Sequence, residues 1–92
     1  MATPLYYATQ EKQIDAMRLL IDHGADVNKH ERYMGTPLFI AIPNKEAVIL
    51  LINNGADVNI THHSGQTLLR LASWLRVDKD IIQLLKDNGA HM

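Results

Sequence analysis

One pentapeptide, Gly-Ala-Asp-Val-Asn, occupies residues 24–28 of this chain and recurs unchanged at residues 55–59. A shortened third copy, Gly-Ala, stands at residues 89–90. The three glycines are 31 and 34 residues apart, and a leucine-rich run precedes each of them. Self-similarity at a nearly fixed period of this size is typical of proteins built from stacked units that contact only their neighbours. The sequence therefore predicts three units of one kind.

A second landmark marks the start of each unit. Thr3 and Thr36 begin the sequence Thr-Pro-Leu, and Thr67 begins Thr-Leu-Leu. A threonine hydroxyl can accept a hydrogen bond from an amide of the first helical turn, which otherwise lacks a partner. Proline suits that turn, since its missing N–H has no partner to lose. We therefore expect a short helix to begin after each threonine, and Pro43 to end the second of these helices.

A second helix in each unit is expected to begin near Ile14, Lys45 and Lys79 and to run to the repeated glycine. Its apolar residues recur with helical spacing. Glycine at that place closes a helix in the left-handed conformation without steric penalty, so positive φ angles are predicted at Gly24 and Gly55. The aspartate after each glycine is expected to bond its own backbone in a turn, and the asparagine is expected to do the same.

Composition excludes several classes of protein. The chain has 92 residues, no cysteine, a net charge of −1 and 47% hydrophobic residues. Disulfides and thiolate metal sites are excluded, and the basic excess that nucleic-acid binding needs is missing. No apolar run is long enough for a membrane helix, and the N-terminus has no signal-peptide pattern. We expect a single small domain inside the cell, in the cytoplasm or nucleus.

These motifs together resemble ankyrin repeats. The matching lines are TPLYYA with LLIDHGADVN, TPLFIA with LLINNGADVN, and TLLRLA with QLLKDNGA. The resemblance implies an all-α fold, a solenoid of helix-turn-helix repeats with projecting hairpin-like loops. We expect one ankyrin repeat domain over residues 1–92, with units at roughly 1–28, 29–59 and 60–92, of which the first and last are incomplete.

The three copies depart from the family pattern at identifiable places. Tyr6, Phe39 and Arg70 stand where the family usually has a histidine that bonds neighbouring backbone. From threonine to glycine the copies span 21, 19 and 22 residues. The turn between the two helices is therefore expected to be shorter in the second copy and longer in the third, where it would run from Trp74 to Asp78.

No set of residues predicts catalysis. His62 and His63 are adjacent in an expected loop, where neighbouring side chains point in opposite directions and no compact ligand pattern assists them. Asp26 and Asp57 occupy equivalent places in successive units, roughly 10 Å apart, which is unsuited to a shared acid–base site. The sequence contains no phosphate-binding glycine loop. We expect no enzyme activity, no metal and no cofactor.

The resemblance implies a non-enzymatic protein-protein interaction module, whose partner docks on the concave surface formed by the loops and first helices. A rigid surface of this kind loses little entropy on binding. The alternative is a structural spacer, or a terminal fragment of a longer ankyrin array with its binding site elsewhere. Carried over by position, the candidate partner-binding residues are His30, Arg32, Tyr33, Thr61, His63, Ser64 and Gln66 in the loops, and Gln10, Glu11, Asn44, Trp74 and Leu75 on the first helices and the turns after them.

Two further expectations concern the ends of the stack. Tyr6, Tyr7, Ile14 and Met17 have no preceding unit to cover them, which predicts weak self-association through the first repeat or marginal stability there. Trp74, the only tryptophan, admits two hypotheses. It either folds back to cover the last unit or remains exposed as an aromatic anchor for a partner.

Overall fold

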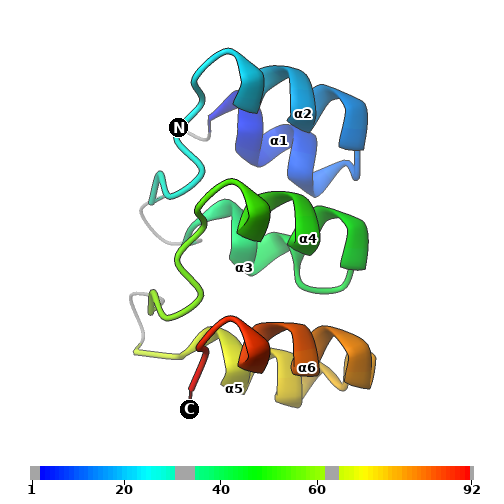
Figure 1. The fold of residues 1–92 in the computed structure, drawn as a ribbon, viewed down its shortest axis with the longest axis vertical. Coiled ribbons are helices and arrows are strands. Elements are labelled where there is room, and N and C mark those ends of the chain that lie inside the picture. The colour runs from blue at the N-terminus through cyan, green and yellow to red at the C-terminus, as the bar shows by residue number, and fades with distance from the viewer. Residues whose placement is uncertain (1–2, 31–34, 62–64, 92) are drawn as a thin grey trace.

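The computed structural model describes residues 3–30, 35–61 and 65–91, and these residues form six helices. The helices are α1 (Pro4–Gln10), α2 (Ile14–Asp22), α3 (Pro37–Ala41), α4 (Lys45–Asn53), α5 (Leu68–Leu75) and α6 (Lys79–Asp87). Consecutive helices form antiparallel pairs, and the three pairs stack in chain order along the longest axis (Figure 1). The all-α repeat solenoid predicted from the sequence is confirmed over these residues.

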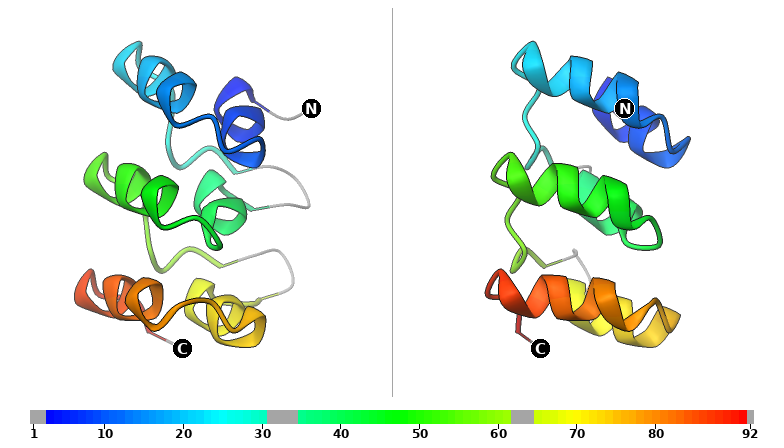
Figure 2. Two further views of the ribbon diagram at one scale, coloured as in Figure 1. Left: turned by 90° about the vertical axis from the view of Figure 1, so that its right-hand side faces the viewer. Right: turned by 45° about the vertical axis from the view of Figure 1, so that its right-hand side comes forward.

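The helices lie in two layers (Figure 2). α1, α3 and α5 form the first-helix layer, and α2, α4 and α6 form the second-helix layer. The turns within the pairs lie at one edge of the stack, and the segments that lead to the next pair leave from the opposite edge (Figure 1). Within the second of these segments Thr61 and Thr67 form an isolated antiparallel bridge, as expected for a hairpin-like connection.

All three first helices begin directly after their threonine, as predicted, and two of the three threonines cap the helix with the side chain. The Oγ1 atoms of Thr3 and Thr67 each accept a hydrogen bond from the amide three residues later, at 3.1 and 3.2 Å. Thr36 differs, because its buried Oγ1 has no hydrogen-bond partner among the described residues. The amide of Phe39 bonds instead to the carbonyl oxygen of Thr36, at 3.0 Å, which is the tighter three-residue spacing of a very short helix. The prediction of a side-chain cap is therefore wrong at Thr36.

This difference predicts opposite effects of one substitution. Thr36→Val is expected to leave the free energy of unfolding unchanged or to raise it by up to about 1 kcal/mol, because it removes a buried hydroxyl without a partner. Thr67→Val removes a capping oxygen and is expected to cost about 1 kcal/mol. Urea unfolding of the two variants makes the comparison. An equal loss of stability at both positions would contradict the assignment at Thr36.

The repeated glycines end the second helices in the left-handed conformation, as predicted. The φ angles of Gly24, Gly55 and Gly89 are 90°, 92° and 91°. A Cβ atom added at any of these glycines would meet no other atom within 4 Å. Space is therefore not the reason for glycine here, and the requirement comes from the backbone conformation alone.

Gly55→Ala is expected to lower the free energy of unfolding by about 1 kcal/mol or more, through left-handed strain rather than a clash. Arg76 offers the reverse case, because it ends α5 with a φ of 56° although it carries a side chain. Arg76→Gly should raise stability by about 0.5 kcal/mol, since relief of strain is partly offset by the freedom of glycine in the unfolded chain. Thermal or urea midpoints that stay at the parent value for Gly55→Ala would show that the helix-stop assignment is wrong.

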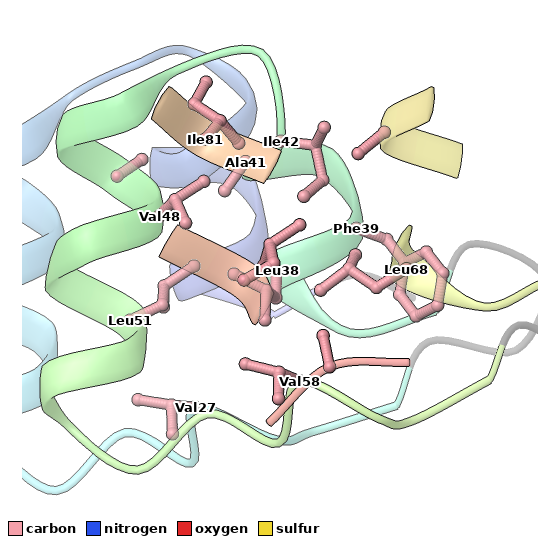
Figure 3. Packing of buried hydrophobic residues seen from close by; sticks show 14 of the residues in the cluster. Val27, Leu38, Phe39, Ala41, Ile42, Val48, Leu51, Val58, Leu68 and Ile81 are labelled. Atoms are coloured by element: carbon pink, nitrogen blue, oxygen red, sulfur yellow. The ribbon is translucent and has the colours of Figure 1, made fainter. Parts of the chain in front are cut away.

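The core runs through all three pairs. Leu38, Val48 and Leu51 of the middle pair are fully buried, and Ile81 of α6 joins the same cluster (Figure 3). Burial also corrects the expectation for the first pair, where Met17 is 0% and Tyr6 is 5% exposed. Both side chains are buried by other residues of this chain, because α1 and α2 pack against each other and against the pair α3 and α4.

The polar residues of the repeated pentapeptide have two separate roles. As predicted, the Oδ1 atoms of Asp26 and Asp57 accept a bond from the amide two residues later, at 2.8 and 2.9 Å. The prediction of the same role for the asparagines is wrong. Each asparagine side chain bridges to the next pair. Its Nδ2 donates to the carbonyl oxygen of the glycine that follows the next second helix, and its Oδ1 accepts from the amide two residues beyond that glycine. The bonds of Asn28 are to Gly55 O (3.0 Å) and Asp57 N (2.8 Å), and those of Asn59 are to Gly89 O (2.8 Å) and His91 N (3.1 Å).

Candidate functional site

Large exposed hydrophobic side chains gather on the first-helix layer. Among the described residues four are strongly exposed, and three of them belong to this layer: Tyr7 on α1 at 56%, and Trp74 and Leu75 on α5 at 75% and 43%. The fourth, Leu19, is 60% exposed on α2 in the other layer. Single exposed hydrophobics are ordinary, whereas several on one side are typical of an interaction surface.

Equivalent positions of the three first helices extend this apolar surface across the stack. Tyr7, Ile40 and Leu71 each stand four residues after the threonine that precedes their helix, and Ile40 and Leu71 are half-buried. Residues three and four positions apart on a helix are neighbours, so Leu71 adjoins Trp74 and Leu75. We call the whole surface the first-helix face, and its residues are Tyr7, Gln10, Glu11, Ile40, Asn44, Leu71, Trp74 and Leu75.

The structure settles the position of Trp74 and corrects one expectation. Trp74 lies in the last turn of α5 and not in the connection after it, because α5 continues to Leu75. With three quarters of its surface exposed, it does not cover the last pair. The hypothesis of a covering role for Trp74 is therefore wrong, and its side chain is available to a partner.

Gln10, Glu11 and Asn44 lie with Trp74 at the edge formed by the turns within the pairs. They differ in whether the side chain already has a role in a helix. Gln10 ends α1 and Glu11 follows it, and both are exposed. Asn44 is half-buried, and its Oδ1 accepts the amide of Ala47 at 3.4 Å, so it caps the start of α4. A substitution of Asn44 would therefore change helix stability as well as any contact with a partner.

The described loop candidates belong to the segments at the opposite edge of the stack. His30 and Thr61 are exposed and Gln66 is half-buried, whereas Arg32, Tyr33, His63 and Ser64 lie outside the described residues. A helix of seven or eight residues is about 10–12 Å long, and this length separates the described loop candidates from Gln10 and Trp74. The described part of the predicted site thus divides into two groups at the two ends of the first helices.

Among the described residues, neither ion pairs nor metal-ligating side chains provide a further candidate site. Lys45 Nζ lies 3.3 Å from Asp80 Oδ2 in an exposed pair between α4 and α6, and such pairs contribute at most about 1 kcal/mol. Within residues 3–30, 35–61 and 65–91 no three histidine, aspartate or glutamate side chains come close enough to hold a metal ion. No helix of these residues has the length and apolar character needed to cross a membrane.

Comparison with known proteins identifies relatives of this chain. The model of the family described as Ankyrin repeat matches residues 2–32 and 35–63. Ankyrin repeat and SAM domain-containing protein 6 of Rattus norvegicus is 38% identical over 88 aligned positions, and the alignment covers 91% of this chain and 10% of that protein. Ankyrin repeat and SOCS box protein 6 of Homo sapiens is 37% identical over 97 aligned positions, 96% of this chain and 23% of that protein. A cation channel, transient receptor potential subfamily A member 1 of Homo sapiens, is 31% identical over 91 residues, 96% of this chain and 8% of the channel.

The repeat names of two of these relatives and the family match agree with the stacked helix pairs of the structure. The chain spans less than a quarter of the length of each of the three relatives. The family match covers the first two helix pairs, while the third pair, where Trp74 and Arg76 stand, lies beyond it. Ankyrin repeats are generally protein-protein interaction modules and are typically non-enzymatic. On the agreement of sequence motifs, stacked helix pairs and family match, the chain belongs to the ankyrin repeat family.

Proposed function

We propose that this chain is a non-enzymatic module that binds a partner protein through its first-helix face. The observation that carries the proposal is the placement of Tyr7, Trp74 and Leu75, which are three of the four strongly exposed large hydrophobics among the described residues. Tryptophan and tyrosine are enriched among the residues that dominate binding energy in protein interfaces. Their partner is a protein, in keeping with the general role of the family.

The physical case rests on aromatic anchors held by a rigid support. Trp74 offers a large apolar area, an indole N–H and only two side-chain rotations, so little entropy is lost when it is fixed by a partner. The helix below it is anchored by Leu68 and Ala72, which are fully buried. The face therefore keeps its shape without a partner.

The remaining predicted residues form a second contact zone in this proposal. His30, Thr61 and Gln66 lie at the loop edge, and a partner that contacts both zones must extend over the length of the first helices. We propose that Arg32, Tyr33, His63 and Ser64, which lie outside the described residues, belong to the same contact zone. We propose that residues 1–92 act as one domain, with units at roughly 1–28, 29–59 and 60–92. We place the primary contact at the turn edge, where Trp74 and Leu75 are exposed.

Quantitative capture tests the proposal. The purified chain is immobilised and exposed to a lysate of its source cells, and the retained protein is identified and titrated against the chain by calorimetry. The double variant Trp74→Ala/Leu75→Ala is expected to lose that binding. Leu19→Ala is the matched control, because it removes a hydrophobic side chain whose exposure lies between those of Trp74 and Leu75 from the other helix layer, and it should bind like the parent. Equal binding by both variants would contradict a role for the first-helix face.

The first pair of the isolated chain is expected to show weak self-association at high concentration or low local stability. Tyr7 is exposed there and Ile14 and Leu20 are only half-buried, so apolar surface remains in contact with water. Light scattering over a concentration series, with amide exchange in residues 14–21 and 47–52, measures both effects. A strict monomer with equally slow exchange in the two segments would rule out this expectation.

A further inference from the structure

One serine hydroxyl stands exposed on α5, at a position that is buried in the two pairs above it. Ser73 lies six residues after Thr67, and its counterparts Thr9 and Ile42 are 3% and 0% exposed. Thr9 also donates its hydroxyl to the carbonyl oxygen of Leu5, at 2.7 Å, whereas in the described part of the chain the Ser73 hydroxyl makes no hydrogen bond. The Ser73 hydroxyl is therefore open to chemistry with another molecule.

The residues around Ser73 also have the character of a surface in contact with water. α5 and α6 form the lower end of the stack (Figure 1). Arg70 is exposed where the upper pairs bury an aromatic side chain, and Lys86 is exposed where they carry isoleucine. Polar replacements of this kind are typical of a water-facing end in a stacked repeat protein. The composition of this end thus agrees with the exposure of Ser73.

Two arginines flank Ser73 at equal distances along the chain. Arg70 stands three residues before it and Arg76 three residues after it, and both side chains are exposed. Residues three apart on a helix are neighbours, so Arg70 and Ser73 share one face of α5. Within the described residues neither guanidinium forms an ion pair. The hydroxyl therefore lies between two cationic residues that have no acidic partner there.

This arrangement has the charge pattern of a kinase substrate. Protein kinases choose their substrates partly by the charges around the acceptor hydroxyl. A kinase with an acidic substrate groove selects a serine or threonine that has arginine three residues before it, because opposite charges across the contact favour that register. Ser73 is the only serine or threonine of this chain with a basic residue at that distance, and the hydrophobic Trp74 follows it directly.

We propose that Ser73 is a phosphorylation site for a protein kinase that selects basic substrates, with ATP as the phosphate donor. The Ser73 Oγ atom bonds to the γ-phosphorus of ATP, the bond from that phosphorus to the bridging oxygen breaks, and ADP leaves with the electron pair. The hydroxyl proton passes to a carboxylate base of the kinase. The modification itself does not depend on the partner-binding proposal.

The fold controls access to this hydroxyl. Ala72 is 0% exposed and holds the segment in α5, so the end of the helix must open locally before a kinase can bind it in extended form. Opening is easier at this end, because α5 stops at Arg76 with a φ of 56°, a left-handed conformation that strains a residue with a side chain. Local opening requires less free energy than global unfolding. Ser73 is therefore expected to react in the folded chain, but more slowly than in a free peptide.

A phosphate on Ser73 would place about two negative charges beside Trp74. Near the C-terminal end of α5 these charges oppose the helix dipole, and the guanidinium groups of Arg70 and Arg76 offset that repulsion through charge-assisted hydrogen bonds. The exposed indole would then adjoin a hydrated anion. Affinity for a partner that buries Trp74 would fall, a consequence that rests on the proposed function.

Phosphate incorporation tests the site without any partner. The folded chain and a peptide of residues 67–79 are each incubated with ATP and calcium/calmodulin-dependent protein kinase II, and mass spectrometry locates the phosphate. We expect phosphate on Ser73 in both, at a rate in the folded chain that is roughly tenfold or more below that in the peptide. Arg70→Gln should lower both rates by about tenfold or more, because it removes the charge that the kinase groove selects.

Three results of this experiment would overturn the proposal. A peptide that takes up no phosphate would show that the sequence is not a kinase substrate. Phosphate in the peptide and none in the folded chain would show that α5 does not open. Incorporation that persists unchanged in Ser73→Ala would assign the phosphate to another hydroxyl.

Fluorescence quenching reports where the added charge lies. Trp74 is the only tryptophan and iodide is an anion, so the iodide quenching constant should be about twofold lower in the phosphorylated chain than in the unmodified chain. Neutral acrylamide is the control and should quench both forms equally. Equal quenching of the two forms by iodide would contradict a phosphate beside the indole.

The captured partner separates this inference from the proposed function. The phosphorylated chain is expected to bind it about tenfold more weakly than the unmodified chain, which calorimetric titration measures. Parent-like binding by Trp74→Ala would contradict the proposed function alone. Parent-like binding by the phosphorylated chain, with weakened binding by Trp74→Ala, would overturn the regulatory role of Ser73.

Discussion

Asn28→Ala is expected to lower the free energy of unfolding by about 2 kcal/mol, although the side chain is only half-buried. The change removes two hydrogen bonds between consecutive pairs and leaves Gly55 O and Asp57 N without partners. A net contribution of about 1 kcal/mol for each bond gives the expected size. The effect should be larger than its exposure suggests, because surface substitutions elsewhere usually stay within about 0.5 kcal/mol.

Asp26→Ala and Asn59→Ala are the matched variants. Asp26 makes one local bond within its own turn and should cost less than Asn28, whereas Asn59 makes the same two bonds to the third pair and should cost about the same. Urea unfolding followed by circular dichroism measures all three. If Asn28→Ala and Asp26→Ala have the same midpoint, the bridge does not couple the pairs.

Trp74→Ala is expected to separate binding from stability. The exposed indole contributes little to the core, so the free energy of unfolding should change by less than about 1 kcal/mol. Affinity for the captured partner should fall by about 2 kcal/mol or more, roughly thirtyfold, which is the size of a strong interface anchor. Urea unfolding and calorimetric titration supply the two values.

Fluorescence quenching gives an independent check on the same residue. Iodide should quench the free chain efficiently, because Trp74 is the only tryptophan and is 75% exposed. A bound partner should protect the indole of Trp74 from quenching by iodide. A stability loss of 2–4 kcal/mol in Trp74→Ala, near the range for truncating a buried aromatic, would show that the side chain is part of the core instead.

The helix boundaries of the second-helix layer could be predicted from the sequence because their signals are local. α2, α4 and α6 begin at Ile14, Lys45 and Lys79, as expected. A glycine that adopts positive φ stops each of them, and this preference is carried by the residue itself. Such signals do not depend on what packs nearby.

The wrong predictions concern residues whose conformation or bonding depends on tertiary contacts or on an unusual backbone conformation. α5 continues through Trp74 because the third copy has no proline at the place of Pro43, and it is stopped by a left-handed Arg76, which no sequence rule marks. The unpaired hydroxyl of Thr36 and the bridge of Asn28 depend on neighbouring units. Threonine and asparagine bond nearby backbone in many turns, so local rules assigned them a local role.

The candidate site stays a prediction, and only part of it could be chosen from the sequence. Trp74, Leu75, Gln10 and Glu11 were located through the repeat register, and the structure places them at one edge of the first helices. Tyr7, which our proposal adds to the candidate site, was not chosen from the sequence, although its position four residues after Thr3 is apolar in all three copies and supplied a signal. Whether the side chain at such a position is exposed or partly buried depends on how the neighbouring pairs stack. The sequence of one unit does not contain this information.

Hydrogen-exchange footprinting of the chain with and without its captured partner tests the central claim most directly. The account predicts that added protection falls on the first-helix layer, in residues 4–11 and 68–75, where Tyr7 and Trp74 stand. The Leu19 region of α2 serves as the internal reference and should exchange at the same rate in both states. Protection confined to α2, α4 and α6, with residues 68–75 unchanged, would contradict binding through the first-helix face.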